Sequence, residues 1–169
     1  MRILYVWDAD YPWDVRTEKV CAALSQAGHQ VVIAARNLEA NTPSEQRPEG
    51  LVERLPSTPL LSRRISSFPV FFNPLWIAHL ARQVRRHRIE LVVVRDLPLA
   101  LTALLVSGPR PVILDMAENY PAMIRDIWTD GRRRPLDVLV RNPAIVALVE
   151  RMVVGRVDHI LTVVEESSQ

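Results

Sequence analysis

The fold is decided by residues 3–35, which read ILYVWDADYPWDVRTEKVCAALSQAGHQVVIAA. Residues 3–7 form an apolar run of β-branched and aromatic side chains, a pattern typical of a buried parallel strand. Asp14 can then cap a helix, whose apolar positions keep helical spacing until Gly28, a common helix stop. The apolar run at residues 30–35 predicts a second buried strand. This order of elements predicts a right-handed βαβ unit.

Strands and helices continue to alternate along the rest of the chain. Further strands are expected at residues 51–55, 90–94, 111–114 and 159–164, and helices at residues 73–88, at residues 98–106 and from Asn142 onward. Asn73-Pro74 and Asn142-Pro143 are both expected to be helix starts, with the asparagine as the cap of the first helix. In the helix at 73–88 we expect Leu75, Trp76, Ile77, Leu80, Ala81 and Val84 to face inward. Residues 37–50 are expected to be a surface loop. The pattern predicts an α/β fold, a Rossmann-like doubly wound parallel sheet of about six to seven strands, with residues 1–169 as a single domain.

Composition excludes several classes of protein. The 169 residues are 49% hydrophobic and 24% charged, as in ordinary globular domains. The longest near-apolar stretch, residues 97–106, is too short to span a bilayer, and the N-terminus does not resemble a signal peptide, so we expect a cytoplasmic protein. Cys21 is the only cysteine, and the four histidines stand at no ligand spacing, so no metal site is expected.

The first turn between strand and helix, residues 8–14, argues against a bound nucleotide. It contains no glycine, and its three carboxylates and two bulky aromatic rings would repel an anionic phosphate and keep it from the backbone. Lys19 is the only lysine of the chain, and no glycine-rich loop precedes it, which excludes a Walker A motif. We therefore expect no cofactor in this domain.

The pair Asp8-x-Asp10 resembles the start of the haloacid-dehalogenase phosphatases, in which the first carboxylate is the nucleophile. However, Pro12 stands where that family has Thr or Val, and a later lysine is missing. Two-component receivers are excluded for the same lack of a lysine. Residues 132–134, all arginine, could bind phosphate groups or form a solvated face, but no aromatic stacking pattern supports nucleic-acid binding.

Polar residues at the carboxyl ends of the strands are the candidates for a binding site, because doubly wound sheets bind ligands there. These residues are Asp8, Asp10, Arg36, Arg95, Asp96, Asp115, Glu118, Asn119, Tyr120 and Glu165.

Several segments together resemble a known family. They are residues 1–6, Tyr11-Pro12 with Asp14 and Arg16, residues 24–31 (LSQAGHQV), residues 114–120 (LDMAENY) and residues 158–165 (DHILTVVE). In this order they are similar to the N-terminal, acceptor-side domain of GT-B glycosyltransferases, in the retaining family 4. The likeness covers nearly the whole chain.

The resemblance implies one half of a GT-B architecture. In that architecture two Rossmann-like domains face a cleft, and the N-terminal one holds the acceptor, here a glycan or a lipid-linked sugar. The nucleotide-sugar donor is expected to bind the C-terminal domain, which is absent from this chain. The fragment is therefore expected to be inactive alone.

Carried onto this chain, the resemblance implies an acceptor-binding site made of residues from several loops. The candidates are Asp10, Asp14, Arg16, Arg95, Asp96, Glu118, Asn119 and Tyr120. Glu118 is the one catalytic candidate, although it could equally hold its loop in shape. Many relatives have a histidine where Ala117 stands, so no histidine role is carried over. Asp14 and Arg16 could contact the acceptor, or serve as a helix cap and a surface ion pair.

Two further alternatives remain open at the level of sequence. Residues 56–76, which are apolar and interrupted by prolines, fit either a peripheral contact with the inner face of a membrane or a contribution to the core. The chain as a whole could instead be a non-catalytic binding module that recognises an anionic ligand or a partner protein through its arginines.

Overall fold

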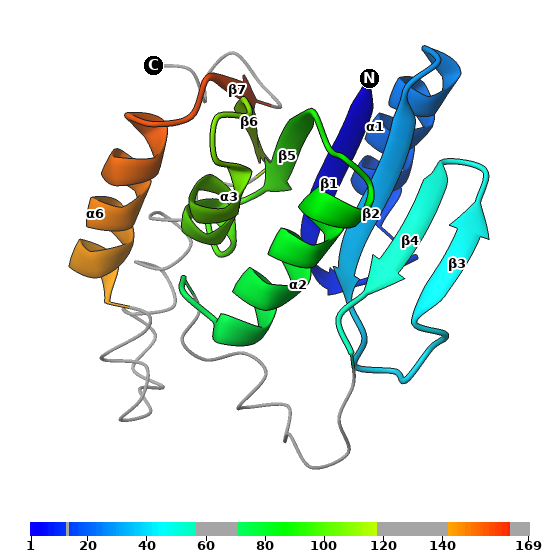
Figure 1. Cartoon of the computed structure of the whole chain (residues 1–169). Helices are drawn as coiled ribbons and strands as arrows, with labels where there is room; N and C mark the ends of the chain where they lie inside the picture. The colour runs from blue at the N-terminus through cyan, green and yellow to red at the C-terminus, as the bar shows by residue number, and fades with distance from the viewer. Residues whose placement is uncertain (13, 57–70, 118–141, 163–169) are drawn as a thin grey trace.

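A seven-stranded sheet forms the centre of the molecule, in the order β3-β4-β2-β1-β5-β6-β7 (Figure 1). The structure is a computed structural model and describes residues 1–12, 14–56, 71–117 and 142–162. The strands are β1 (Arg2–Asp10), β2 (Gln30–Arg36), β3 (Ser44–Arg47), β4 (Gly50–Arg54), β5 (Leu91–Arg95), β6 (Val112–Met116) and β7 (His159–Thr162). The helices in these ranges are α1 (Val15–Gln26), α2 (Pro74–Arg86), α3 (Ala100–Ser107) and α6 (Pro143–Val154).

The sheet is wound outward from β1 in both directions. β1 pairs in parallel with β2 on one side and with β5 on the other. β4 then adds to β2, β6 adds to β5 and β7 adds to β6, all in parallel, while β3 is antiparallel to β4. This topology confirms the predicted doubly wound sheet and its number of strands.

Helices cover both faces of the sheet (Figure 1). Side chains alternate along β1, so Tyr5 packs in the core beneath α1, while Leu4 and Val6 pack in the core beneath α2, α3 and α6. Cys21 of α1 is fully buried, as expected of a structural cysteine, and burial raises the pKa of its thiol. Burial on two faces explains why the central strands are apolar throughout.

Three helices begin at capping residues that the sequence predicted. Asp14 Oδ1 accepts from the amide of Thr17 at 2.7 Å at the start of α1. At the starts of α2 and α6, the side chains of Asn73 and Asn142 cap the helix, and a proline follows each of them. Such caps satisfy amides that have no partner within the helix.

The expectation of a surface loop at residues 37–50 was wrong, because part of it is the edge strand β3. Arg47 of β3 lies opposite Gly50 of β4 across a tight turn. The φ of Gly50 is +153°, and a Cβ there would lie 2.6 Å from the carbonyl oxygen of Val31. The charged composition of β3 is typical of an edge strand, in which charged side chains prevent pairing with other chains. Because β3 has no apolar residue, the hydrophobic pattern of the sequence did not indicate a strand there.

The inward face of α2 was predicted only in part. Trp76, Leu80 and Val84 are buried, but Leu75 is 40% exposed. His79 and Gln83 are buried in their place. The buried residues follow the i, i+3, i+4, i+7, i+8 spacing that starts at Trp76. Leu75 is apolar but lies outside this spacing, and so it is not on the buried face.

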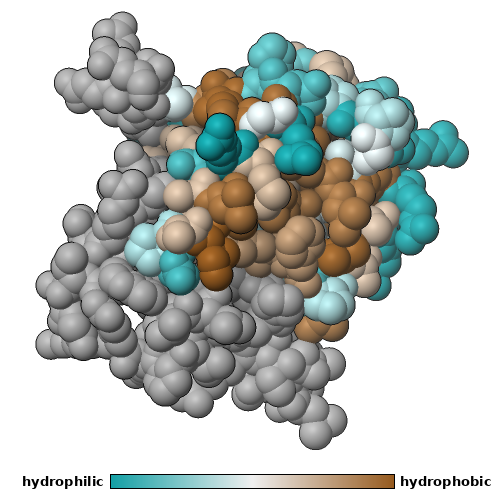
Figure 2. Space-filling model, turned by 90° about the vertical axis from the view of Figure 1, so that its left-hand side faces the viewer, coloured by the Kyte–Doolittle hydropathy of each residue, from teal (hydrophilic) through white to brown (hydrophobic). Residues whose placement is uncertain are grey.

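Apolar side chains are exposed on the side of the molecule that carries α6 (Figure 2). Ile145 and Leu148 of α6 are 39% and 57% exposed, and all four residues of the edge strand β7 are exposed. In the described ranges, no helix has the length and apolar character that a membrane span requires.

Candidate functional site

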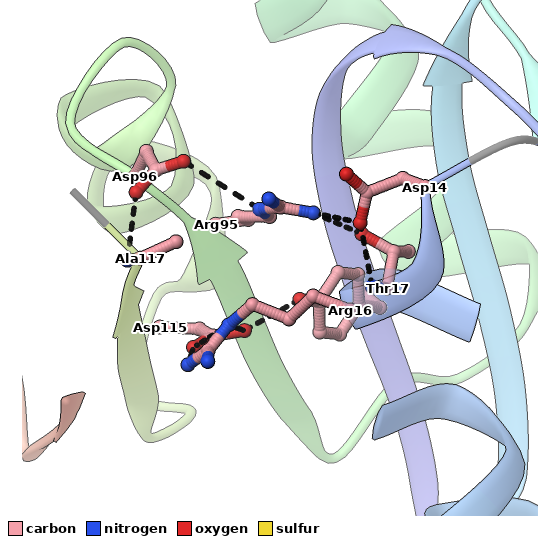
Figure 3. Close-up of polar contacts among 8 residues, drawn as sticks. Asp14, Arg16, Thr17, Arg95, Asp96, Asp115 and Ala117 are labelled. Carbon is pink, nitrogen blue, oxygen red and sulfur yellow. Dashed lines mark hydrogen bonds and ion pairs between the residues drawn. The ribbon is translucent and has the colours of Figure 1, made fainter. Parts of the chain in front are cut away.

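The two halves of the sheet meet between β1 and β5. The chain leaves β1 toward β2 on one side and returns to β5 on the other, so these neighbours mark the topological switch point. Doubly wound sheets bind their ligands at this place, beyond the carboxyl ends of the strands. We call the side chains gathered there the switch-point cluster. It consists of Asp14, Arg16, Thr17, Arg95, Asp96 and Asp115, which Figure 3 labels, together with Trp7.

Arg95, at the end of β5, connects three elements of the cluster. Its Nη1 donates to Asp14 Oδ1 and, at 2.8 Å, to Thr17 Oγ1, both at the start of α1. Its guanidinium lies 4.1 Å from the centre of the Trp7 ring, a cation–π contact with the end of β1. Desolvation opposes ionisation of Asp14, but its hydrogen bonds with Thr17 and Arg95 prevail and lower its pKa.

Arg16 and Asp115 form a second connection, between α1 and β6. Arg16 Nε donates to Asp115 Oδ1 at 3.1 Å, and its Nη2 donates to the same oxygen. Tyr5 of β1 donates its hydroxyl to Asp115 Oδ2 at 2.6 Å. Burial and this hydrogen bond raise the pKa of Tyr5, and the bond to Asp115 raises that of Arg16. Asp115 is fully buried, whereas the Arg16 side chain is 27% exposed, so Arg16 is the member of this pair that a ligand can reach.

Asp96 joins the ends of β5 and β6. Its backbone amide donates to the Asp115 carbonyl at 3.0 Å, and its Oδ1 accepts from the amide of Ala117 at 2.9 Å. Its Oδ2 lies 3.5 Å from Arg95 Nε. The residue is 8% exposed and has a positive φ of 58°.

Asp10 lies on the other side of β1, toward β2. Its carboxylate accepts from the backbone amides of Leu38 and Glu39, at 2.8 and 3.1 Å. Nearby, Asp8 is paired with Arg36, although burial still raises the pKa of Asp8. The hydrogen bonds of Asp10 thus hold the connection after β2, and they do not join it to the switch-point cluster.

Residues 14–167 match the family model described as glycosyl transferase 4-like domain. The chain belongs to this family. Among curated proteins no significant match was found.

The fold of this glycosyl transferase 4-like domain is shared with solved glycosyltransferases of the GT-B type. Sucrose-phosphate synthase from Thermosynechococcus elongatus superposes with a TM-score of 0.69 at 11% identity, over 94% of this chain and 41% of that one. The calicheamicin glycosyltransferase CalG4 superposes with a TM-score of 0.50 at 18% identity, over 93% of this chain and 41% of that one. The chain therefore spans about 41% of each structure and has the fold of one Rossmann-like half of the GT-B architecture.

Other predicted positions lie partly or wholly outside the described residues. Glu118, Asn119 and Tyr120 are outside them, as are residues 57–70 of the apolar segment 56–76. In the described end of that segment Trp76 is fully buried and Phe72 is 48% exposed, so one aromatic ring belongs to the core and the other does not.

Sequence reasoning missed Trp7 and Thr17, and it named Asp115 only as a strand-end residue. Trp7 could have been found as the aromatic residue that ends the predicted strand at residues 3–7, although β1 itself continues to Asp10. The role of Asp115 could be seen only in three dimensions, because its partners Tyr5 and Arg16 are about a hundred residues away in the chain.

The charge of the cluster limits what the domain can bind there. Asp14, Asp96 and Asp115 carry three negative charges, and Arg16 and Arg95 carry two positive ones, which leaves one net negative charge. An anionic phosphate is disfavoured by this balance, while hydroxyl groups can both donate to and accept from such side chains. Within the described residues, no three His, Cys, Asp or Glu side chains form a possible metal site.

Two surface hollows of this domain lie away from the cluster. One, of about 360 Å³, is lined by Arg2, Gln30 and Gly50, the first residues of β1, β2 and β4, together with neighbouring residues. The other, of about 320 Å³, lies between α1 and the β3–β4 turn. Neither is lined by a residue of the cluster.

Proposed function

We propose that this domain binds the acceptor in a glycosyltransferase reaction, at the switch-point cluster. One observation carries the proposal: Asp14, Arg16, Arg95 and Asp96, predicted from widely separated loops, come together at the switch point in a cluster without net positive charge. Such a surface suits the neutral hydroxyl groups of a sugar. It is poorly suited to an anionic ligand, which counts against the alternative of a module that recognises anions through its arginines.

The finer parts of the proposal concern the whole enzyme. The donor would be a nucleotide-sugar bound to a second domain. Transfer would proceed with retention of configuration at the anomeric carbon of the sugar, and this domain alone would be inactive. The chain spans 41% of the GT-B structures that it matches, which leaves room in them for a second domain. Glu118, the residue after Ala117, is the candidate for contact with the reacting sugar.

The nature of the acceptor is a separate proposal. A lipid-linked acceptor at the inner face of a membrane is supported by Phe72 and Leu75, which are 48% and 40% exposed at the start of α2. A soluble glycan would need no such apolar contact. Cytoplasmic location follows from the same proposal.

Titration of the ¹⁵N-labelled chain followed by NMR tests acceptor binding at the cluster. The probes are maltose and methyl α-D-glucopyranoside as neutral saccharides, and UDP as the nucleotide. We expect a saccharide to shift the amides of Arg16, Thr17, Asp96 and Ala117, and UDP to leave them unchanged. Arg16→Gln should weaken the saccharide response, whereas Arg156→Gln, an exposed arginine after α6, should not. Shifts of these amides by UDP but by neither saccharide would overturn the proposal.

A further inference from the structure

Asp96 stands at a sharp turn between β5 and α3. Its φ of 58° lies in the left-handed region, which costs most residues other than glycine about 1 kcal/mol or more but is tolerated by Asp and Asn. The turn brings the next apolar residues, Leu97 and Leu99, into the core, where each is 1% exposed. The backbone conformation of Asp96 therefore serves the packing of the chain before α3.

The side chain of Asp96 serves a different purpose. Its Oδ1 accepts from the amide of Ala117 at 2.9 Å, just past the end of β6. The backbone amide of the same residue donates to the carbonyl of Asp115. Asp96 thus binds the chain of β6 on both sides of Met116. A buried carboxylate that accepts from a backbone amide makes a stronger bond than a neutral acceptor, so the end of β6 is firmly held.

From this geometry we infer that Asp96 is a positioning residue for the acceptor site. It fixes the backbone at Ala117, the residue directly after β6, at the edge of the switch-point cluster (Figure 3). The inference rests on the proposed function for its meaning, since Ala117 lies beside the switch-point cluster at which we propose that the acceptor binds.

Two substitutions separate the side chain of Asp96 from its backbone. Asp96→Gly tolerates the left-handed conformation but has no acceptor for Ala117. Asp96→Asn tolerates the same conformation and keeps an Oδ1 acceptor. If the side chain only supports the turn before α3, the two variants should behave alike. If it positions Ala117, only the glycine variant should lose that contact.

Hydrogen exchange of the Ala117 amide, measured by NMR without any ligand, tests the positioning itself. We expect exchange to be at least about tenfold faster in Asp96→Gly, a loss of about 1.4 kcal/mol of protection, and clearly less accelerated in Asp96→Asn, which keeps a neutral acceptor. Unchanged protection in the glycine variant would overturn the inference. If that variant fails to fold, the Ala117 amide shift of the wild type should follow a carboxyl titration that is missing in Asp96→Asn, and its absence in the wild type would count against the inference.

The saccharide titration then tests whether positioning matters for the acceptor. Asp96→Gly should weaken saccharide binding at least about fivefold. Asp96→Asn, which keeps an acceptor for Ala117, should bind saccharide more tightly than the glycine variant. If no saccharide binds the wild type, the proposed function fails, while the Ala117 exchange result still decides the positioning. If the glycine variant loses Ala117 protection but binds saccharide as well as the wild type, the role of Asp96 in the acceptor site is refuted.

Discussion

Asp115 is the residue on which the connection between β1, α1 and β6 depends. It is fully buried, it forms an ion pair with Arg16, and it accepts a hydrogen bond from the hydroxyl of Tyr5. A buried carboxylate with one arginine partner is costly to disturb, because the partner loses its counter-charge while it remains partly desolvated.

Asp115→Asn should therefore destabilise the domain by about 2–4 kcal/mol in urea unfolding, since it leaves Arg16 without a counter-charge. Glu90→Gln is the matched control, because Glu90 also pairs with an arginine, Arg2, but at the solvent-exposed surface. We expect no resolvable change in the control. Equal effects of the two substitutions would show that burial of Asp115 does not set the strength of its pairing.

At the scale of elements, the start of α1 carries both a helix cap and part of the switch-point cluster. Asp14 accepts from the Thr17 amide and from Arg95. The start of α6 has a similar cap, in which Asn142 accepts from the Ala144 amide at 2.9 Å. The described contacts of Asn142 include no charged partner, so the two helices form a natural pair for comparison.

Asn142→Ala should cost about 1 kcal/mol, the usual value for a lost cap. Asp14→Ala should cost at least about 1 kcal/mol more, because a hydrogen bond to the charged Arg95 is lost as well. Chemical unfolding of both variants measures the difference. Equal losses would mean that the bond between Asp14 and Arg95 adds nothing to stability.

The β3–β4 hairpin depends on a glycine for a steric reason. Gly50→Ala would place a Cβ 2.6 Å from the Val31 carbonyl oxygen at a φ of +153°. We expect a loss of more than about 1 kcal/mol, seen as a lower Tm. Gly155→Ala is the control, because Gly155 has a φ of −75° and its nearest neighbour would lie at 3.4 Å. The control should change stability by less than about 1 kcal/mol, and a similar Tm loss in both would contradict the steric explanation.

At the scale of the whole molecule, stability should depend on pH through a buried histidine. His79 of α2 is 2% exposed, its Nε2 lies 3.2 Å from the Glu53 carbonyl oxygen, and Arg82 lies 3.3 Å from its Nδ1. Burial lowers the pKa of His79 to about 4. In the unfolded chain the pKa of this histidine is near 6.5, so between about pH 4 and pH 6.5 the unfolded chain binds more protons than the folded one. The stability from this group is therefore full above about pH 6.5 and falls as the pH is lowered.

Between pH 7.5 and pH 5 we expect a loss of about 2 kcal/mol from this group. His79→Gln should remove most of this slope, whereas His159→Gln, on the exposed strand β7, should keep it. Urea unfolding at a series of pH values checks the prediction. A slope that persists in His79→Gln would assign the pH dependence to other groups.

Much of the fold could be predicted because local patterns in the sequence report it directly. The apolar strands, Asp14 as a cap and the two Asn-Pro helix starts act within a few residues of their own positions. β3 was missed because its stability comes from pairing with β4, and its charged residues carry no hydrophobic pattern. Burial of His79 was missed because it depends on the carbonyl of Glu53 across the interface between α2 and β4.

The sequence by itself determined which polar residues follow each strand, and the parallel topology placed those strand ends at one edge of the sheet. Only the tertiary structure decided how they are paired, because a partner is chosen by distance in space. It joined Asp14 to Arg95, Arg16 to Asp115 and Asp96 to Ala117, and it left Asp10 outside the cluster. The acidic first turn is therefore a set of partners for backbone amides and arginines, and its carboxylates act through those contacts.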